Sequence, residues 1–172
     1  LPSSKRGIVS TANYNARKFG IGSAMPISEA YRRCPQGEYR KPQFSLYKKE
    51  SGHVMQILSM FCTKMEQVSI DEAYLDITDF AADVGVRKAA IAIRKTVLEE
   101  TGLSCSLGIS RSRYVSKIAS DFRKPGGIVI VKNPREFLAA LHLSVIPGIG
   151  KKNISVLRKY GLLAIGDVAE LE

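Results

Sequence analysis

Apolar side chains along the chain recur with two different periods, and these predict two kinds of element. Steps of three, four or seven residues indicate amphipathic helices, whereas short runs of β-branched and apolar residues indicate strands. The predicted helices cover residues 13–18, 26–34, 44–65, 86–100, 112–122 and 134–141. The predicted strands cover residues 8–11, 68–70, 73–77, 104–109 and 127–131.

From residue 44 onward the predicted order is helix, strand, strand, helix, strand, helix, strand. Such an order suits a single sheet covered on one face by helices, so the predicted fold class is α+β. A ferredoxin-like sheet of this kind has one more strand before its first helix, and we expect that strand upstream of Leu1.

Composition adds a basic charge to this picture. The 172 residues are 45% apolar and 24% charged, as in an ordinary globular chain. The formal net charge is +10, and residues 1–50 alone carry ten Lys or Arg against three Asp or Glu. A basic excess of this size favours a polyanionic partner, with nucleic acid first among them.

Cysteine usage and hydropathy exclude several classes of protein. Three widely spaced cysteines, Cys34, Cys62 and Cys105, do not suit a disulfide framework or a zinc cluster, which favours a reducing compartment. No apolar run approaches the ~18 residues of a membrane helix. The chain begins without a signal-peptide pattern or an initiator Met, so we expect it to start inside a longer protein.

Two adjacent acids, Asp71 and Glu72, lie between the predicted strands 68–70 and 73–77. A bend between strands lets both carboxylates approach one point, where they repel unless a proton or a divalent cation lies between them. Mg²⁺ prefers such ligands and completes its shell with water and substrate phosphates. The alternative is a solvated hairpin tip, since acids are common at exposed turns.

Two further features are suited to phosphate. Tyr14 and Arg17 are three residues apart and lie on one face of a helix that Asn13 can cap. Lys124 precedes a Pro-Gly-Gly bend that could hold an ammonium over a phosphate. The plainer alternatives are a surface Tyr packed beside an Arg and a solvated turn lysine.

Residues 145–161 have the form of a helix-hairpin-helix. Gly148 and Gly150 allow a turn that directs backbone N–H groups outward, and Lys151 and Lys152 add charge at the start of the next helix. Donors without side chains suit a phosphate and distinguish no base, so this stretch predicts binding to the DNA backbone. An ordinary turn between two helices is the alternative.

Several stretches of the chain together carry a resemblance to one family. They are Ser10–Gly20, Ser23–Pro26, Ser69–Asp76, Lys117–Asp121, Lys124–Gly126 and Ile146–Gly150. These stretches resemble the Y-family DNA polymerases of the DinB, or DNA polymerase IV, branch. The resemblance spans nearly the whole chain in the order of the family.

The resemblance implies a fragment of a right-hand polymerase. Residues 1–43 would be the fingers, residues 44–132 a ferredoxin-like palm with a mixed or antiparallel sheet, and residues 133–172 an α-helical thumb with the helix-hairpin-helix. Its activity would be translesion synthesis on primer–template DNA with deoxynucleoside triphosphates. It further implies a monomer in the cytoplasm, at the nucleoid, or in a eukaryotic nucleus. It allows a sliding clamp to bind beyond residue 172.

The resemblance also implies roles for particular residues. Asp71 and Glu72 would be catalytic ligands of two Mg²⁺ ions. Tyr14, Arg17 and Lys124, with Thr11 as a weaker candidate, would hold the incoming triphosphate. Gly148, Gly150, Lys151 and Lys152 would bind DNA.

The sequence departs from the family at three places. The first metal-binding Asp and the residue that excludes ribonucleotides would lie upstream of Leu1, and the little finger would lie beyond Glu172, so we expect the 172 residues alone to be inactive. Arg111, Ser112 and Arg113 replace an Asn-Lys pattern in a loop expected to face DNA.

Two other functions compete with the polymerase. A non-catalytic helix-hairpin-helix protein would bind DNA while its acids do nothing. A nuclease or glycosylase of this motif needs a catalytic Lys or Asp after the hairpin, where Asp167 is the acid nearby.

Overall fold

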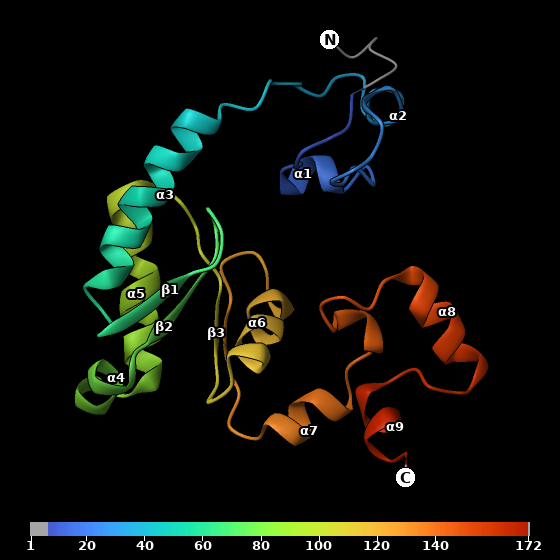
Figure 1. The fold of residues 1–172 in the computed structure, drawn as a ribbon. Coiled ribbons are helices and arrows are strands. Elements are labelled where there is room, and N and C mark those ends of the chain that lie inside the picture. Colours follow the sequence, from blue (N-terminus) through green and yellow to red (C-terminus); the bar gives the residue numbers. More distant parts are fainter. Residues whose placement is uncertain (1–6, 172) are drawn as a thin grey trace. The chain divides into compact units, whose positions relative to one another are not determined.

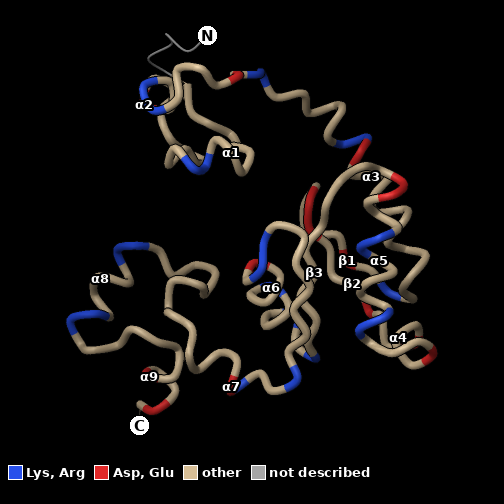
Figure 2. The backbone as a smooth tube through the Cα atoms, turned by 180° about the vertical axis from the view of Figure 1, so that it is seen from behind, with Lys and Arg blue, Asp and Glu red and all other residues tan. Residues whose placement is uncertain are grey.

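A computed structural model describes residues 7–171 of the chain (Figure 1). The chain forms two compact units, one up to Tyr47 and one from Lys48 onward. Lys and Arg residues occur along both of them (Figure 2). The boundary falls within helix α3 (Phe44–Ser59). The assignment of fingers, palm and thumb stays a prediction.

The first unit is small and built on two short helices, α1 (Tyr14–Arg17) and α2 (Ile27–Arg33). Its core consists of four buried residues, Val9, Ile21, Ala30 and Cys34. The strand predicted for residues 8–11 is reduced to an isolated bridge between Ile8 and Pro26. A single bridge is enough to bury Val9 at the centre of this core, and no longer ladder forms in the described residues.

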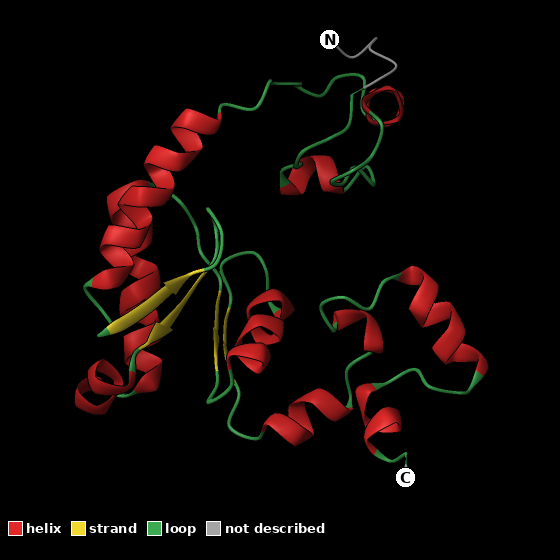
Figure 3. Ribbon diagram, in the orientation of Figure 1, coloured by secondary structure: helices red, strands yellow, loops and turns green. Residues whose placement is uncertain are grey.

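The second unit is α+β, as the sequence predicts. Its described strands form two pairs, as Figure 3 shows: β1 (Lys64–Gln67) runs antiparallel to β2 (Ala73–Asp76), and β3 (Leu107–Ile109) runs parallel to β4 (Ile128–Ile130). Sheet topology is therefore mixed. The prediction of one continuous sheet differs from this arrangement, because no hydrogen bonds join the two pairs within residues 7–171.

Helices cover both faces of the β3–β4 pair. Leu107 of β3 packs against the core that α3 shares with helix α5 (Val86–Thr101). Its neighbour Gly108 lies against helix α6 (Arg113–Phe122), since a Cβ at Gly108 would be 2.0 Å from the Ser116 carbonyl oxygen. Neighbouring strand residues face opposite sides, so the expectation of helices on one face alone is wrong.

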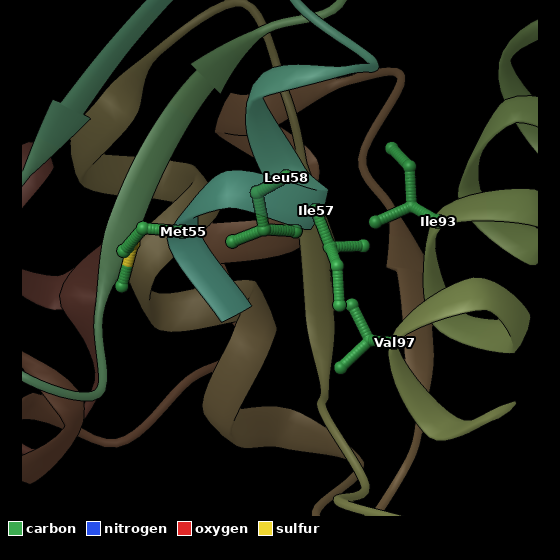
Figure 4. Close-up of a cluster of buried hydrophobic side chains, with 5 residues drawn as sticks. All are labelled: Met55, Ile57, Leu58, Ile93 and Val97. Atoms are coloured by element: carbon green, nitrogen blue, oxygen red, sulfur yellow. The ribbon is translucent and has the colours of Figure 1, made fainter. Parts of the chain in front are cut away.

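The principal core lies between α3, α5 and the strands. Met55, Ile57 and Leu58 of α3 meet Ile93 and Val97 of α5 (Figure 4). Partly buried residues of both strand pairs pack on this cluster, among them Leu75 of β2 and Leu107 of β3. One helical layer thus supports both pairs.

Two details of the predicted order are corrected by the structure. Helix α3 ends at Ser59, and Met65, which was predicted to be helical, lies in β1 opposite Leu75. Helix α4 (Thr78–Val84) follows β2 directly and was not predicted. Asp76, the last residue of β2, holds the first residue of this helix: its Oδ1 accepts hydrogen bonds from Thr78 N at 3.1 Å and from Thr78 Oγ1 at 2.6 Å.

The C-terminal part of the second unit is helical. It contains α7 (Pro134–Ala139), the 3₁₀ helix η1 (Leu143–Val145), α8 (Lys151–Lys159) and α9 (Ile165–Ala169). Leu143 is buried at its centre, and an antiparallel bridge joins His142 to Ala164. This bridge and Leu143 hold the loop that leads into α8.

Candidate functional site

The acid pair lies in the turn of the β1–β2 hairpin, as the sequence predicts. The strand predicted for residues 68–70 is wrong, because these residues belong to the turn and β1 ends at Gln67. The turn is closed by the Glu72 carbonyl oxygen, which accepts hydrogen bonds from Val68 N at 2.9 Å and Ser69 N at 3.2 Å. Asp71 is exposed, and its Oδ1 accepts a hydrogen bond from Ser69 Oγ at 2.6 Å. Backbone and serine hydroxyl together therefore fix the turn that carries both carboxylates.

Glu72 is held by a lysine from a distant part of the chain. Lys117 Nζ, on α6, donates a hydrogen bond to Glu72 Oε1 across 45 positions of sequence. The lysine side chain is 28% exposed and the glutamate side chain 40%. A cation therefore already lies against one of the two predicted metal ligands.

The same lysine is shared with a second carboxylate. Lys117 Nζ lies 3.7 Å from Asp121 Oδ2, and the other oxygen of Asp121, Oδ1, forms an ion pair with Lys124 Nζ. The four charged side chains form one connected series, which we call the ion-pair series. Its members in order are Glu72, Lys117, Asp121 and Lys124.

The acids keep Lys117 charged. Burial alone would lower the pKa of the Lys117 ammonium, but the hydrogen bond to Glu72 and the charges of Asp121 and Glu72 together raise it above its usual value. At neutral pH this residue is therefore a fixed positive charge beside Glu72.

A second ion pair ties α6 to the hairpin. Arg113 pairs with Glu66 of β1, and its Cζ lies 5.7 Å from the centre of the Tyr74 ring on β2. Arg113, Lys117 and Asp121 are four residues apart, so they form one stripe along α6. Arg113 begins α6 and its side chain is 67% exposed, so the prediction that this stretch faces DNA stays a prediction.

The acid pair suits a divalent cation in donor type and number. Mg²⁺ commonly takes one or two carboxylates and completes its shell with water and phosphate oxygens. Asp71 and Glu72 supply two such carboxylates, and the ammonium against Glu72 shows that a positive charge is favourable there. Among residues 7–171, no group of three or more His, Cys, Asp or Glu residues is placed to hold a metal.

Tyr14 and Arg17 lie together in the first unit. The Arg17 guanidinium carbon lies 5.1 Å from the centre of the Tyr14 ring, and Arg17 Nε donates a 2.9 Å hydrogen bond to the Ala12 carbonyl oxygen. Asn13 caps the helix as predicted, by accepting a hydrogen bond from Ala16 N at 2.8 Å. Helix α1 is one turn long, so its dipole adds little to anion binding. Thr11 is exposed nearby in sequence.

The predicted hairpin before α8 has the expected backbone. Gly148 has a φ of +92°, where a side chain would be strained, and Gly150 is the N-cap of α8. Gly150 has no side chain to occupy the first amides of the helix, and Lys151 and Lys152 are exposed beside them. The element before the hairpin is the three-residue η1 rather than an α-helix.

The end of α8 also follows the predicted pattern. Gly161 N bonds to the Arg158 carbonyl oxygen at 3.1 Å, and Leu162 N bonds to the Leu157 carbonyl oxygen at 3.1 Å, which is a Schellman motif. Gly161 takes the left-handed conformation that this motif requires, with a φ of +78°.

Sequence reasoning missed Lys117 and Arg113 as partners of the hairpin, and Asp121 as a second partner of Lys117. Their spacing of four residues was a usable signal, because it predicts one charged stripe on a helix whose other face, with Val115, Ile118 and Ala119, is buried. The contact of Arg113 with Glu66 and that of Lys117 with Glu72 could not be predicted from spacing, since both depend on tertiary structure.

Fold and sequence together define the class of protein. Residues 1–121 match the model of the impB/mucB/samB family. The chain belongs to this family, the Y-family DNA polymerases of the DinB branch.

Particular relatives agree with this assignment. DNA polymerase IV of Methanoculleus marisnigri is 48% identical over 95% of this chain and 46% of its own length. DNA polymerase IV of Staphylococcus aureus strain JH9 is 39% identical over 97% of this chain and 48% of its own length. The chain thus spans about half the length of these curated relatives.

Solved structures show the same fold. DinB from Sulfolobus solfataricus superposes with a TM-score of 0.89 at 32% identity, over 96% of this chain and 50% of that one. An insertion ternary complex of Dbh DNA polymerase gives a TM-score of 0.90 at 31% identity, over 99% and 51%. Within residues 7–171, no helix is long and apolar enough to cross a membrane.

Proposed function

We propose that the protein is a template-directed DNA polymerase of the translesion type, which transfers nucleotides from deoxynucleoside triphosphates to a primer 3′-hydroxyl. The observation that carries this proposal is the hairpin with Asp71 and Glu72, braced by Lys117, in a chain of the Y family. The relatives named DNA polymerase IV support it.

Asp71 and Glu72 are proposed as the metal ligands of this chain. Two bound Mg²⁺ ions would lower the pKa of the primer hydroxyl and neutralise charge on the phosphates. Both acids belong to one turn, in which Ser69 holds the Asp71 carboxylate by a hydrogen bond and Lys117 holds the Glu72 carboxylate. Both acids thereby start from a restricted set of positions, which favours metal binding.

Lys124 is proposed to bind the triphosphate. Its side chain is 42% exposed and its ammonium is held by Asp121, so it can exchange this carboxylate for a more highly charged phosphate. In the first unit, Tyr14 and Arg17 are proposed to contact phosphate oxygens through their hydroxyl and guanidinium, with Thr11 as a further donor.

The turn before α8 is proposed to bind the DNA backbone. Lys151 and the uncapped start of α8 lie beside a surface depression of about 450 Å³, which Arg158 also lines. Amides and ammonium groups at one place favour a phosphate and distinguish no base. With Lys152, this gives binding that is independent of sequence.

The proposal is tested by primer extension with the intact protein on undamaged and abasic templates in the presence of Mg²⁺. We expect extension on both templates, and we expect Glu72→Ala to abolish it. The matched control is Asp83→Asn, an exposed acid of α4. If Glu72→Ala extends primers as well as the control, the acids are not catalytic. A protein that binds primer–template yet never extends it would instead be the non-catalytic DNA-binding protein.

A further inference from the structure

Lys117 lies between two carboxylates, and both of them compete for it. Its ammonium bonds Glu72 and lies 3.7 Å from Asp121 Oδ2. Asp121 is four residues further along α6, with its side chain 52% exposed. A small rotation of the lysine side chain is enough to transfer it from one carboxylate to the other, because long side chains on one helix face reach each other at this spacing.

This arrangement matters for a metal ligand. The Lys117 ammonium bonds one oxygen of Glu72, Oε1, and its positive charge repels a divalent cation, so Lys117 competes with metal at Glu72. Without a second acceptor, Lys117 would either stay bonded to Glu72 and hinder metal binding, or be left as an unpaired ammonium once the metal is bound. Asp121 provides that second acceptor, and its other oxygen stays bonded to Lys124.

We propose that Asp121 is a positioning residue for metal binding: it accepts the Lys117 ammonium when a divalent cation takes Glu72. The inference rests on the proposed function, in which Glu72 is a metal ligand. Asp121 touches neither metal nor substrate and acts through Lys117. The ion-pair series thereby exchanges one cation for another at Glu72 without leaving a carboxylate or an ammonium unpaired.

The direction of each effect follows from this exchange. Asp121→Asn removes the second acceptor, so Lys117 stays on Glu72 and the metal binds more weakly. Lys117→Met removes the competitor, so the metal binds more tightly. A partly exposed ion pair is weak, so each change is between about twofold and fivefold.

The test measures Mn²⁺ binding to the intact protein by electron paramagnetic resonance, without nucleotide or DNA. The variants are Asp121→Asn, Lys117→Met and the double variant, with Asp83→Asn as an exposed acidic control. We expect the dissociation constant to rise with Asp121→Asn, to fall with Lys117→Met, and to be unaffected by Asp121→Asn once Lys117 is Met.

The double variant separates the exchange from a general loss of negative charge. If Asp121→Asn weakens Mn²⁺ binding by the same factor whether residue 117 is Lys or Met, the Asp121 charge acts on the metal directly. In that case the proposed exchange through Lys117 is wrong. An unchanged dissociation constant for Asp121→Asn also overturns it, and both results leave the proposed polymerase intact. If Glu72→Gln binds Mn²⁺ like wild type, Glu72 is no metal ligand, and the proposed function fails together with the inference.

Discussion

At the scale of single residues, Gly108 allows helix α6, which carries Lys117, to pack closely against strand β3. Gly108 of β3 lies under α6, where an added Cβ would be 2.0 Å from the Ser116 carbonyl oxygen and 2.4 Å from Ser120 N. Both contacts are to backbone, which cannot rotate away. Since α6 also carries Lys117, this glycine sets where the lysine can meet Glu72.

Gly108→Ala is predicted to destabilise the protein by about 3 kcal/mol, as overpacking against backbone does. Urea unfolding of the intact protein measures the change. Primer extension should fall as well, because α6 must move away from the sheet.

Gly52→Ala is the matched control for this prediction. Gly52 is exposed on α3, with no described atom within 4 Å of an added Cβ outside its own helix. Alanine should stabilise that helix by about 0.5–1 kcal/mol. A Gly108→Ala protein as stable as wild type would contradict the close packing of α6 on β3.

At the scale of elements, the carboxylate of Asp167 caps the start of helix α9. Asp167 in the first turn of α9 accepts hydrogen bonds from Ala164 N and Leu163 N, each at 2.8 Å. These two bonds lower the pKa of Asp167 below its ordinary value of 3.8, against a small opposing effect of burial. The charged carboxylate therefore stabilises the folded state.

This cap predicts a pH dependence. A lowered pKa means that the stabilising effect is present above the ordinary value and is lost as pH falls through the lowered one. Asp167→Asn should therefore have a lower melting temperature than wild type at about pH 6 and approach it at about pH 3. Thermal unfolding by circular dichroism at both pH values checks this. Asp83→Asn should match wild type at both, and equal behaviour of Asp167→Asn would contradict the cap.

The basic start of α8 predicts a salt dependence. Each lysine that contacts a phosphate releases counterions, so Lys151→Ala and Lys152→Ala together should reduce the slope of log affinity against log salt by up to about 2. Fluorescence anisotropy on two unrelated duplexes measures it, and the loss should be equal on both. Lys88→Ala, an exposed lysine of α5, is the control. A loss confined to one duplex would mean that the lysines read bases.

At the scale of the whole molecule, helices and strands with a clear period of apolar residues were predictable, and those without such a period were not. The helices α3, α5 and α6 show helical spacing of apolar residues, and all three exist. Strand β1 gave no signal because its four residues are all exposed, so no alternation marks it. Helix α4 was not predicted, because Leu75 and Ile77 continue the apolar alternation of β2 as far as Thr78, the first residue of α4.

The candidate site was predictable where it is local. Asp71 and Glu72 follow from one bend, and the turn before α8 follows from its glycines. The roles of Lys117 and Arg113 became visible with the structure, because their partners on the hairpin are 45 and 47 residues away. Local chemistry can be inferred from spacing, whereas ion pairs across the fold depend on how elements pack.

The central claim is that the hairpin acids perform nucleotidyl transfer, and the rate of single-nucleotide incorporation by Asp71→Asn tests it most directly. With the intact protein in excess over primer–template and saturating nucleotide, we expect a rate at least about 100-fold below wild type, since a metal ligand is lost. Affinity for DNA should be unchanged, and Asp83→Asn should incorporate at the wild-type rate. An Asp71→Asn protein that incorporates as fast as this control would contradict the claim.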